Sequence, residues 1–200
     1  MIAAEGAMRL VAAPERRAVC AMLARAFAND PAMCWLFPDP AVRARRLPGL
    51  FAILYDSDGP RGVRLATGEL EAATLWRGPG SAETGIAEML RYALPMLATF
   101  GLALPRALAL SEAIDMHMPR EPFWYLHIAG CDPASQGRGL GRAAVVAGLD
   151  RFMGTRLPAY LETATERNLG FYQGLGFRVT ADWRVGRDGP RFWSMRREPV

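Results

Sequence analysis

One stretch of this chain constrains its fold more than any other: the almost continuously apolar and aromatic run FWYLHIAGC at residues 123–131. Such a run predicts a central strand that is buried on both faces of a sheet. It is followed by DPASQ, by glycines at positions 137, 139 and 141, and by an alanine-rich helix expected to end near Met153. The sequence therefore places a bare glycine loop between a buried strand and the start of a helix.

The remaining segments alternate between helical and strand patterns. Helices are expected at about 14–27, 41–55 with a kink or division at Pro48, 83–100, 105–118 and 166–175. Short alternating or strand-like segments are expected at about 8–12, 63–67, 69–76, 158–164, 176–185 and 191–197. With helices in the middle and strands at both ends, residues 1–200 are predicted to form one α/β domain whose mixed sheet is covered by helices.

Composition narrows the class of protein. Of the 200 residues, 51% are hydrophobic and 22% are charged, which is typical of a soluble globular domain. The net charge is +4 and the pI is about 9.3, but the basic residues are spread along the chain, so we expect no nucleic-acid partner. All 24 basic residues are arginine, which excludes any mechanism that needs a lysine.

Cysteine usage and apolar runs bear on the compartment. Cys20, Cys34 and Cys131 are widely spaced, which favours reduced thiols in a cytoplasm over a disulfide framework or a zinc site, and no metal is expected. The first residues do not read as a signal peptide. The longest uncharged run, 92–105, is shorter than the ~20 residues of a membrane span. We therefore expect a cytoplasmic protein without a membrane partner.

The glycine loop has three possible interpretations as a phosphate-binding site, and the sequence does not support them equally. A Walker loop requires a lysine, which this chain lacks. A dinucleotide fingerprint would run from Gly139 to Ala144 with Glu162 as the ribose-binding acid, but its glycines follow the strand too late and too little chain remains. The third interpretation uses helix geometry alone. Backbone amides and the positive helix end would hold an anion, with Arg138 and Arg142 supplying charge.

A second motif follows in NLGFYQGLGF. Asn168 and Tyr172 are four residues apart, so a helix places both on one face, toward one ligand. A phenol with an ordinary pKa of about 10 is protonated at neutral pH and can act as a general acid. The alternative is an aromatic side chain that packs beside Phe171, Leu175 and Phe177. The nearby glycine loop favours the functional interpretation.

Together these segments resemble the GCN5-related N-acetyltransferase family, whose acetyl-CoA motif, Gln/Arg-x-x-Gly-x-Gly/Ala, is matched by Gln136, Gly139 and Gly141. The resemblance implies that acetyl-CoA is the co-substrate and that the loop amides hold its pyrophosphate. It also implies that the preceding strand binds the pantetheine arm, that Asn168 contacts CoA and that Tyr172 protonates the leaving thiolate. The residues implied in cofactor binding are Ala129, Gly130, Cys131, Gln136, Gly137, Arg138, Gly139, Leu140, Gly141, Arg142, Asn168 and Tyr172.

The resemblance covers nearly the whole chain. It implies a mixed, mostly antiparallel sheet of about six to seven strands flanked by helices. The central strands would splay to form the acetyl-CoA cleft, within residues 120–180 or so. Segments such as AFANDPAMCWLFPDP and YLETATERNLGFYQGLGF resemble the branch that contains puromycin-type N-acetyltransferases. Gly130 and Cys131 depart from the aliphatic residues common in the family, a change that loosens the strand but leaves backbone binding intact.

A base is needed, because an amine must lose a proton to attack a thioester. The candidates are His117, His127, Glu112, Asp115 and Glu162. Desolvation beside the cofactor would raise the pKa of Glu162 toward a useful value. His117 precedes the turn into the buried strand, near the expected mouth of a substrate pocket, whereas His127 lies inside that strand, where a hydrogen-bonded core histidine is more typical. The choice stays open at this point.

The aromatic segment NDPAMCWLFPDP is too long for a simple linker. By resemblance, it would cover the acceptor site with Trp35 and Phe37 as walls. The alternative is a loop whose aromatic side chains fill the core.

The predicted function is transfer of an acetyl group from acetyl-CoA to the amine of a small molecule by direct attack in a ternary complex. Two alternatives are kept: a CoA-binding sensor without catalysis, and an enzyme acting on a protein or peptide amine. The sequence does not identify the acceptor, and a homodimer is compatible with it.

Overall fold

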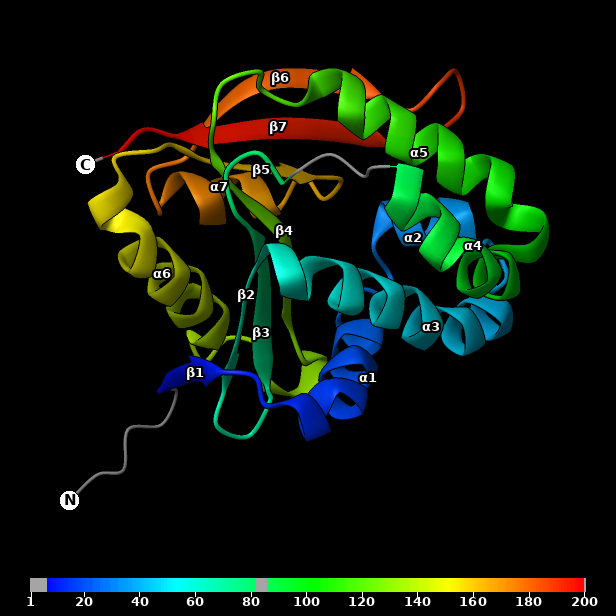
Figure 1. Ribbon diagram of the computed structural model, residues 1–200, viewed down its shortest axis with the longest axis horizontal. Coiled ribbons are helices and arrows are strands. Elements are labelled where there is room, and N and C mark those ends of the chain that lie inside the picture. The colour runs from blue at the N-terminus through cyan, green and yellow to red at the C-terminus, as the bar shows by residue number, and fades with distance from the viewer. Residues whose placement is uncertain (1–6, 82–85, 200) are drawn as a thin grey trace.

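The computed structural model describes residues 7–81 and 86–199 (Figure 1). Within these residues, one sheet of seven strands has the order β1-β2-β3-β4-β5-β7-β6. The strands are β1 (Met8–Leu10), β2 (Gly62–Thr67), β3 (Ala72–Arg77), β4 (Trp124–Cys131), β5 (Ala159–Thr163), β6 (Arg178–Arg184) and β7 (Arg191–Arg197). Neighbouring strands are antiparallel except for the parallel pair β4 and β5. The mixed, mostly antiparallel sheet that the sequence predicts is confirmed.

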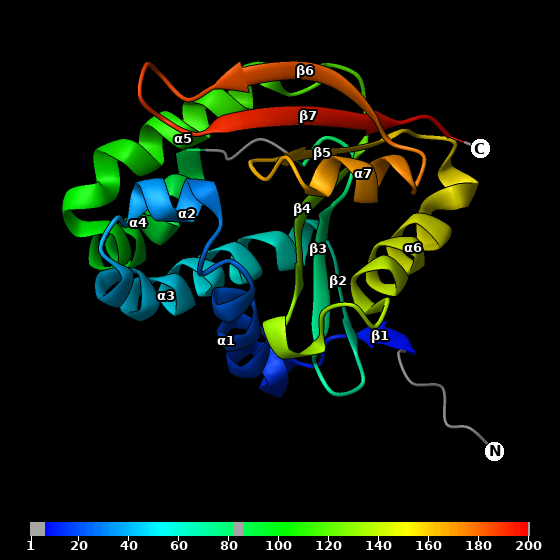
Figure 2. The ribbon, with the colours of Figure 1, turned by 180° about the vertical axis from the view of Figure 1, so that it is seen from behind.

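Helices cover this sheet on both sides. They are α1 (Arg16–Ala26), α2 (Pro31–Leu36), α3 (Pro40–Asp58), α4 (Ile86–Phe100), α5 (Leu104–His117), α6 (Leu140–Phe152) and α7 (Asn168–Gln173). Figures 1 and 2 show α6 on one side of β2, β3 and β4, with α1 and α3 on the other. Buried side chains accordingly form one large cluster beneath α1 to α3 and another beneath α6.

The central strands of the sheet separate. β4 pairs with β5 only at Trp124 with Ala159 and at Tyr125 with Tyr160, although both strands continue beyond these residues. β4 instead keeps β3 as its partner up to Cys131, and β5 keeps β7. The two halves of the sheet therefore diverge, and the splayed arrangement expected from the sequence is present.

The splay changes the burial expected for the central strand. In the first half of β4, Tyr125 and Leu126 are buried, as the apolar run predicts. Residues 129–131 are only partly buried, because β5 no longer lies beside them. The strand predicted to be buried on both faces is thus buried in its first half, whereas its second half forms a wall of the cleft.

Two prolines in the first half of the chain, Pro31 and Pro40, begin helices instead of breaking them. Asp30 caps α2 by accepting hydrogen bonds from the backbone N–H groups of Ala32 and Met33 at 2.9 and 3.2 Å. Pro31 then occupies the first turn, where a missing N–H costs little. The segment interpreted as a covering loop is therefore partly helical. Pro48 lies inside α3 without dividing it.

α4 and α5 follow one another around a turn at Gly101, whose φ is 49°. The predicted start at Glu83 lies outside the described residues. By length and composition alone, the stretch Arg91–His117 is long and apolar enough to cross a membrane. The turn at Gly101 makes it two helices rather than one straight span, and both line the cavity described below.

Candidate active site

The glycine loop lies open to solvent at the start of α6. Residues 136–139 are exposed, and Leu140 and Gly141 begin the helix. Gly137 and Gly139 have φ angles of 81° and 79°, in the left-handed region that glycine adopts without strain. A Cβ atom at either position would meet nothing within 4 Å, so space remains beside the loop. Exposed backbone at a helix N-terminus suits an anionic ligand.

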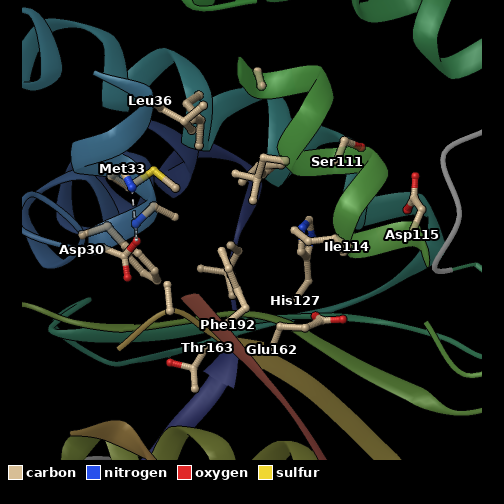
Figure 3. A pocket seen from close by; sticks show the side chains of 18 of the residues that line it. Asp30, Met33, Leu36, Ser111, Ile114, Asp115, His127, Glu162, Thr163 and Phe192 are labelled. Carbon is tan, nitrogen blue, oxygen red and sulfur yellow. Dashed lines mark hydrogen bonds between the residues drawn. The ribbon is translucent and has the colours of Figure 1, made fainter. Parts of the chain in front are cut away.

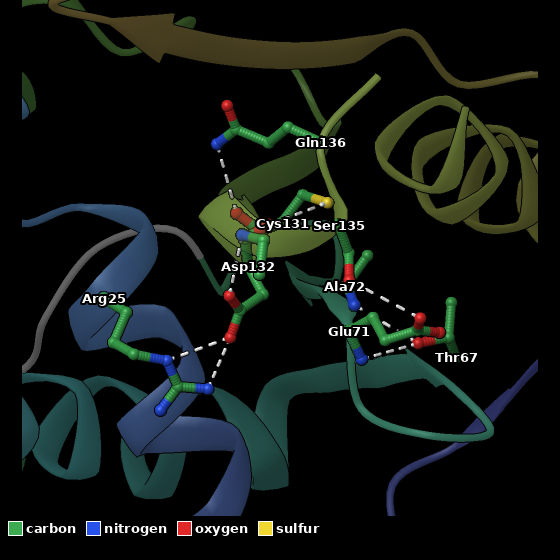
Figure 4. A network of polar contacts seen from close by, with 9 residues as sticks. Arg25, Thr67, Glu71, Ala72, Cys131, Asp132, Ser135 and Gln136 are labelled. Atoms are coloured by element: carbon green, nitrogen blue, oxygen red, sulfur yellow. Dashed lines mark hydrogen bonds and ion pairs between the residues drawn. The ribbon is translucent and has the colours of Figure 1, made fainter. Parts of the chain in front are cut away.

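Polar contacts fix this loop to the sheet (Figure 4). The Asp132 carboxylate accepts a hydrogen bond from Arg25 Nε at 2.9 Å, and the Asp132 N–H donates to the Glu71 carbonyl at 2.7 Å. Arg138 Nη1 donates to Glu71 Oε1 at 2.6 Å, while Leu140 is buried beneath the loop. Because Arg138 is already paired, the backbone amides are the main groups that the loop offers to a ligand.

The last residues of β4 form the wall next to the loop. Within the described residues, no strand pairs with Ala129, Gly130 or Cys131 on the side of β5. Gln136 Nε2 donates to the Cys131 carbonyl at 3.4 Å. A Cβ on Gly130 would lie 2.6 Å from Cδ2 of Leu23, so glycine lets α1 pack close against the strand. The departure noted in the sequence therefore has a packing cause.

A cavity of about 790 Å³ opens where β4 and β5 separate. β4 and β5 line its base, helices α2 to α5 form its walls, and α7 contributes Asn168 and Tyr172. The two residues thus face one space, as their spacing predicts. Arg142 Nη1 donates to the Gly174 carbonyl at 3.3 Å, which ties the start of α6 to the end of α7.

Tyr172 is almost fully buried, with 7% of its surface exposed. Its ring makes edge contacts with Phe171 and Phe177 at centroid distances of 5.0 and 5.9 Å. Burial, and then the negative charge of Asp30, raise the pKa of the phenol well above its ordinary value. Tyr172 is therefore protonated at any physiological pH, as a proton donor must be.

Glu162 lines the same cavity from β5 (Figure 3). Both carboxylate oxygens are buried and lack a partner with hydrogen-bond geometry. Burial raises the pKa of this carboxyl from 4.5 to about 7, although the hydroxyls of Tyr125 and Tyr160 counter part of the shift. A carboxyl with a pKa near neutrality can accept a proton and release it again.

The sequence patterns single out neither of two carboxyls: Asp30, which lines the cavity, and Asp58, which is fully buried and contacts the cavity-lining His127. Asp30, the cap of α2, also accepts a hydrogen bond from Thr165 Oγ1 at 3.3 Å, and burial raises the pKa of its carboxyl (Figure 3). Asp58, at the end of α3, contacts His127 Nδ1 at 2.8 Å. An N-cap signal before Pro31 could have identified Asp30. Nothing local identifies Asp58, which lies 69 residues before its partner.

Three predicted residues lie elsewhere. His117 is stacked on Trp183 at a centroid distance of 4.2 Å, and its Nδ1 contacts the Ala113 carbonyl at 2.7 Å. Phe37 is buried behind the cavity wall, stacked on Phe100 at 5.9 Å. None of His117, Trp35 and Phe37 is among the residues that line the cavity. From α2, the residues that do so are Ala32, Met33 and Leu36.

No group of three or more histidine, cysteine, aspartate or glutamate side chains that could hold a metal ion occurs within residues 7–81 and 86–199.

The splayed sheet with its flanking helices has the same fold as solved acetyltransferase structures, some of them described as GCN5-related N-acetyltransferases. This fold is shared with a Corynebacterium glutamicum protein described as "histone acetyltransferase HPA2 and related acetyltransferase", at a TM-score of 0.75 and 22% identity over 96% of both chains. The polyamine N-acetyltransferase of Drosophila melanogaster has a TM-score of 0.62 and 15% identity over 96% of this chain and 99% of its own.

At the level of sequence, part of the chain is similar to mycothiol acetyltransferases. The chain is 31% identical over 106 residues to the mycothiol acetyltransferase of Mycobacteroides abscessus, covering 48% of this chain and 36% of that protein. The chain spans from a fifth to about a third of the length of the curated relatives it matches. No protein-family model matches the sequence.

Proposed function

We propose that this chain is an N-acetyltransferase that moves an acetyl group from acetyl-CoA to the amine of a small molecule by direct attack. The observation that carries the proposal is one cavity, at the splay of β4 and β5, that holds both Glu162 and Tyr172. The glycine loop and α6 lie at the far end of the same splayed strand. The names of the curated relatives and structural neighbours support the acetyl-transfer chemistry.

The residues present fit CoA. The open backbone of Gly137 and Gly139 at the start of α6 suits a pyrophosphate. The free edge of β4 at residues 129–131 offers backbone groups that a pantetheine amide can pair with, as in the addition of a strand. Asn168 lines the cavity, which Ala129 of this edge also lines.

The chemistry of the chain's own groups follows from their protonation. Acetyl-CoA supplies an activated acyl thioester. Glu162, ionised above about pH 7, accepts a proton from the attacking amine. Tyr172 holds its proton because of burial and the nearby Asp30, and gives it to the departing sulfur.

The walls of the cavity favour a small acceptor with an apolar body. Met33, Leu50, Phe100, Ile114 and Phe192 are among the side chains that line it. Such walls gain free energy by burying hydrocarbon, at roughly 25 cal/mol per Å². The puromycin-type branch suggested by the sequence stays a prediction, as do a cytoplasmic location, a single domain and a homodimer.

The test measures CoA thiol release from acetyl-CoA with a panel of amines, beside direct CoA binding by calorimetry. Release that depends on an amine supports the proposal. Binding of CoA without release for any amine points to the alternative of a CoA sensor, and release with peptides alone points to a protein or peptide acceptor. Absence of both binding and release contradicts the proposal.

A further inference from the structure

A cluster of buried charges lies directly beside the cavity. His127 projects from β4 into it, near Glu162 and Ile114 (Figure 3). Its Nδ1 lies 3.0 and 2.8 Å from the two carboxylate oxygens of Asp58. Asp58 is fully buried and also accepts a hydrogen bond from Arg77 Nε at 2.6 Å.

The geometry fixes the role of each nitrogen of His127. A carboxylate only accepts hydrogen bonds, so Nδ1 carries the proton that it donates to Asp58. In the neutral ring, Nε2 therefore holds a lone pair and lies on the side of the ring away from Asp58. The His127 side chain lines the cavity and keeps 16% of its surface exposed. A carboxylate that orients a histidine in this way prepares the far nitrogen to take a proton.

His127 and Arg77 stabilise the ionised form of the buried Asp58 carboxyl. Burial alone would raise the pKa of Asp58, but His127 and Arg77 outweigh it and hold the pKa of this carboxyl below its ordinary value. Asp58 therefore stays ionised and stabilises a proton gained by His127. Besides His127, the charged or titratable groups that line the cavity are Asp30, Arg77, Tyr92, Glu112, Asp115, Tyr125, Glu162 and Tyr172.

We propose that His127, positioned by Asp58, is a second proton acceptor, and that the site therefore takes alkylamines in their charged ammonium form. This inference rests on the proposed acetyl transfer. An ammonium has two protons to lose before an amide is complete, whereas Glu162 can hold only one of them.

Each of the two bases removes one proton from the acceptor nitrogen. Glu162 takes one proton from the ammonium, which gives a nucleophilic amine. The nitrogen then forms a bond to the acyl carbon, the carbon–sulfur bond breaks, and His127 Nε2 takes the second proton. Tyr172 protonates the sulfur and regains a proton from one of the two bases. The remaining proton leaves to water, so the net products are amide, thiol and one proton.

The sharpest test uses two amines and both histidines of the chain. The amines are an alkylamine that the parent acetylates and its analogue with three fluorine atoms on the β-carbon, which is largely uncharged at neutral pH and so has one proton fewer to lose. We expect H127Q to lower kcat about a hundred-fold for the charged amine and much less for the uncharged one. H117Q is the matched control, because His117 lies outside the cavity, and should behave like the parent.

An equal loss of kcat with both amines, or no loss with either, would overturn the inference. A parent protein that acetylates no amine would instead overturn the proposed function, so the two failures are distinguishable.

Two further variants separate catalysis from folding. His127→Ala leaves room for free imidazole, which should restore amine-dependent thiol release in proportion to its concentration, and a lack of rescue in a folded variant contradicts the role. Asp58→Asn, which changes a positioning residue, removes the charge that stabilises protonated His127. The variant should therefore lower kcat for the charged amine more than for the uncharged one, whereas equal losses with both amines would contradict the positioning role.

Discussion

At the scale of single residues, the two carboxyls near Tyr172 have different tasks because their surroundings differ. Asp30 is held by the N–H groups of α2, and its charge helps to keep Tyr172 protonated. Glu162 has no partner of hydrogen-bond geometry, and burial raises its pKa to about 7. One carboxyl thus supports the acid while the other is available as the base.

Replacing Tyr172 by phenylalanine removes the proposed acid with little change in volume. We expect kcat to fall about a hundred-fold or more, with CoA affinity close to that of the parent. Stopped thiol-release assays and calorimetry measure the two quantities. Tyr55→Phe is the matched control, since Tyr55 is also buried but does not line the cavity. Equal activity of Tyr172→Phe and the parent at every pH would exclude Tyr172 as the acid.

Glu162 links activity and stability to pH in opposite directions. Activity should fall as the pH drops below about 7, because protonated Glu162 cannot accept a proton. Its folded pKa lies above its unfolded value, so the folded state binds the proton more tightly and stability falls as the pH rises from about 4.5 to about 7.

Glu162→Gln should therefore raise the free energy of unfolding at pH 8, by up to about 3 kcal/mol, and change it little at pH 4.5. Chemical denaturation at the two pH values measures the difference, and kcat should fall in the same variant. A variant that is less stable than the parent at pH 8 would show that the ionised carboxylate is well solvated or paired.

At the scale of elements, we expect the glycine loop and the start of α6 to bind an anion together. Gly139→Ala should strain a backbone whose φ is 79° and displace the amides. We expect CoA affinity to fall roughly tenfold, which corresponds to about 1.4 kcal/mol. Gly68→Ala, in the turn between β2 and β3, is the control, because a Cβ there meets nothing within 4 Å. Unchanged affinity in Gly139→Ala would argue against loop binding of the pyrophosphate.

Local patterns predicted some elements of the site and missed others, for physical reasons. The spacing of Asn168 and Tyr172 and the glycines of the loop depend only on neighbours in the chain. Asn168 and Tyr172 line the cavity, and the glycines lie at the start of α6, after the splayed strand β4. The segment with Trp35 and Phe37 reaches the cavity, but neither of these two side chains lines it, because the short helix α2 turns other side chains toward the cavity. The prolines at the start of α2 and just after it suggest a break in the chain, so the sequence pattern does not predict this helix.

The site features that the sequence does not predict depend on contacts between segments far apart in the chain. His127 appears as an isolated histidine in a strand, and only the fold brings Asp58 and Arg77 to it. His117 was expected near a pocket mouth, but its ring is stacked on Trp183 from the terminal hairpin. Such pairings depend on tertiary packing that no local period encodes.

At the scale of the whole molecule, the cavity lies between the two halves of the sheet and is flanked by helices whose cavity-facing side chains are mostly apolar. We therefore expect arylalkylamines and branched alkylamines to have a higher kcat/KM than polyamines, amino acids or aminosugars of similar size. Steady-state kinetics over such a panel measures this order. Preference for a polyhydroxylated or multiply charged amine would contradict the account of the acceptor pocket.

The central claim is that the splay of β4 and β5, with the loop at the start of α6, is an acetyl-CoA site. Hydrogen–deuterium exchange with and without acetyl-CoA tests it most directly, since it reports on backbone amides along the chain. The account predicts slower exchange at residues 129–142 and 168–173, with little change in β1 and β2. Unchanged exchange at these two segments under saturating acetyl-CoA, or protection confined to another part of the sheet, would contradict it.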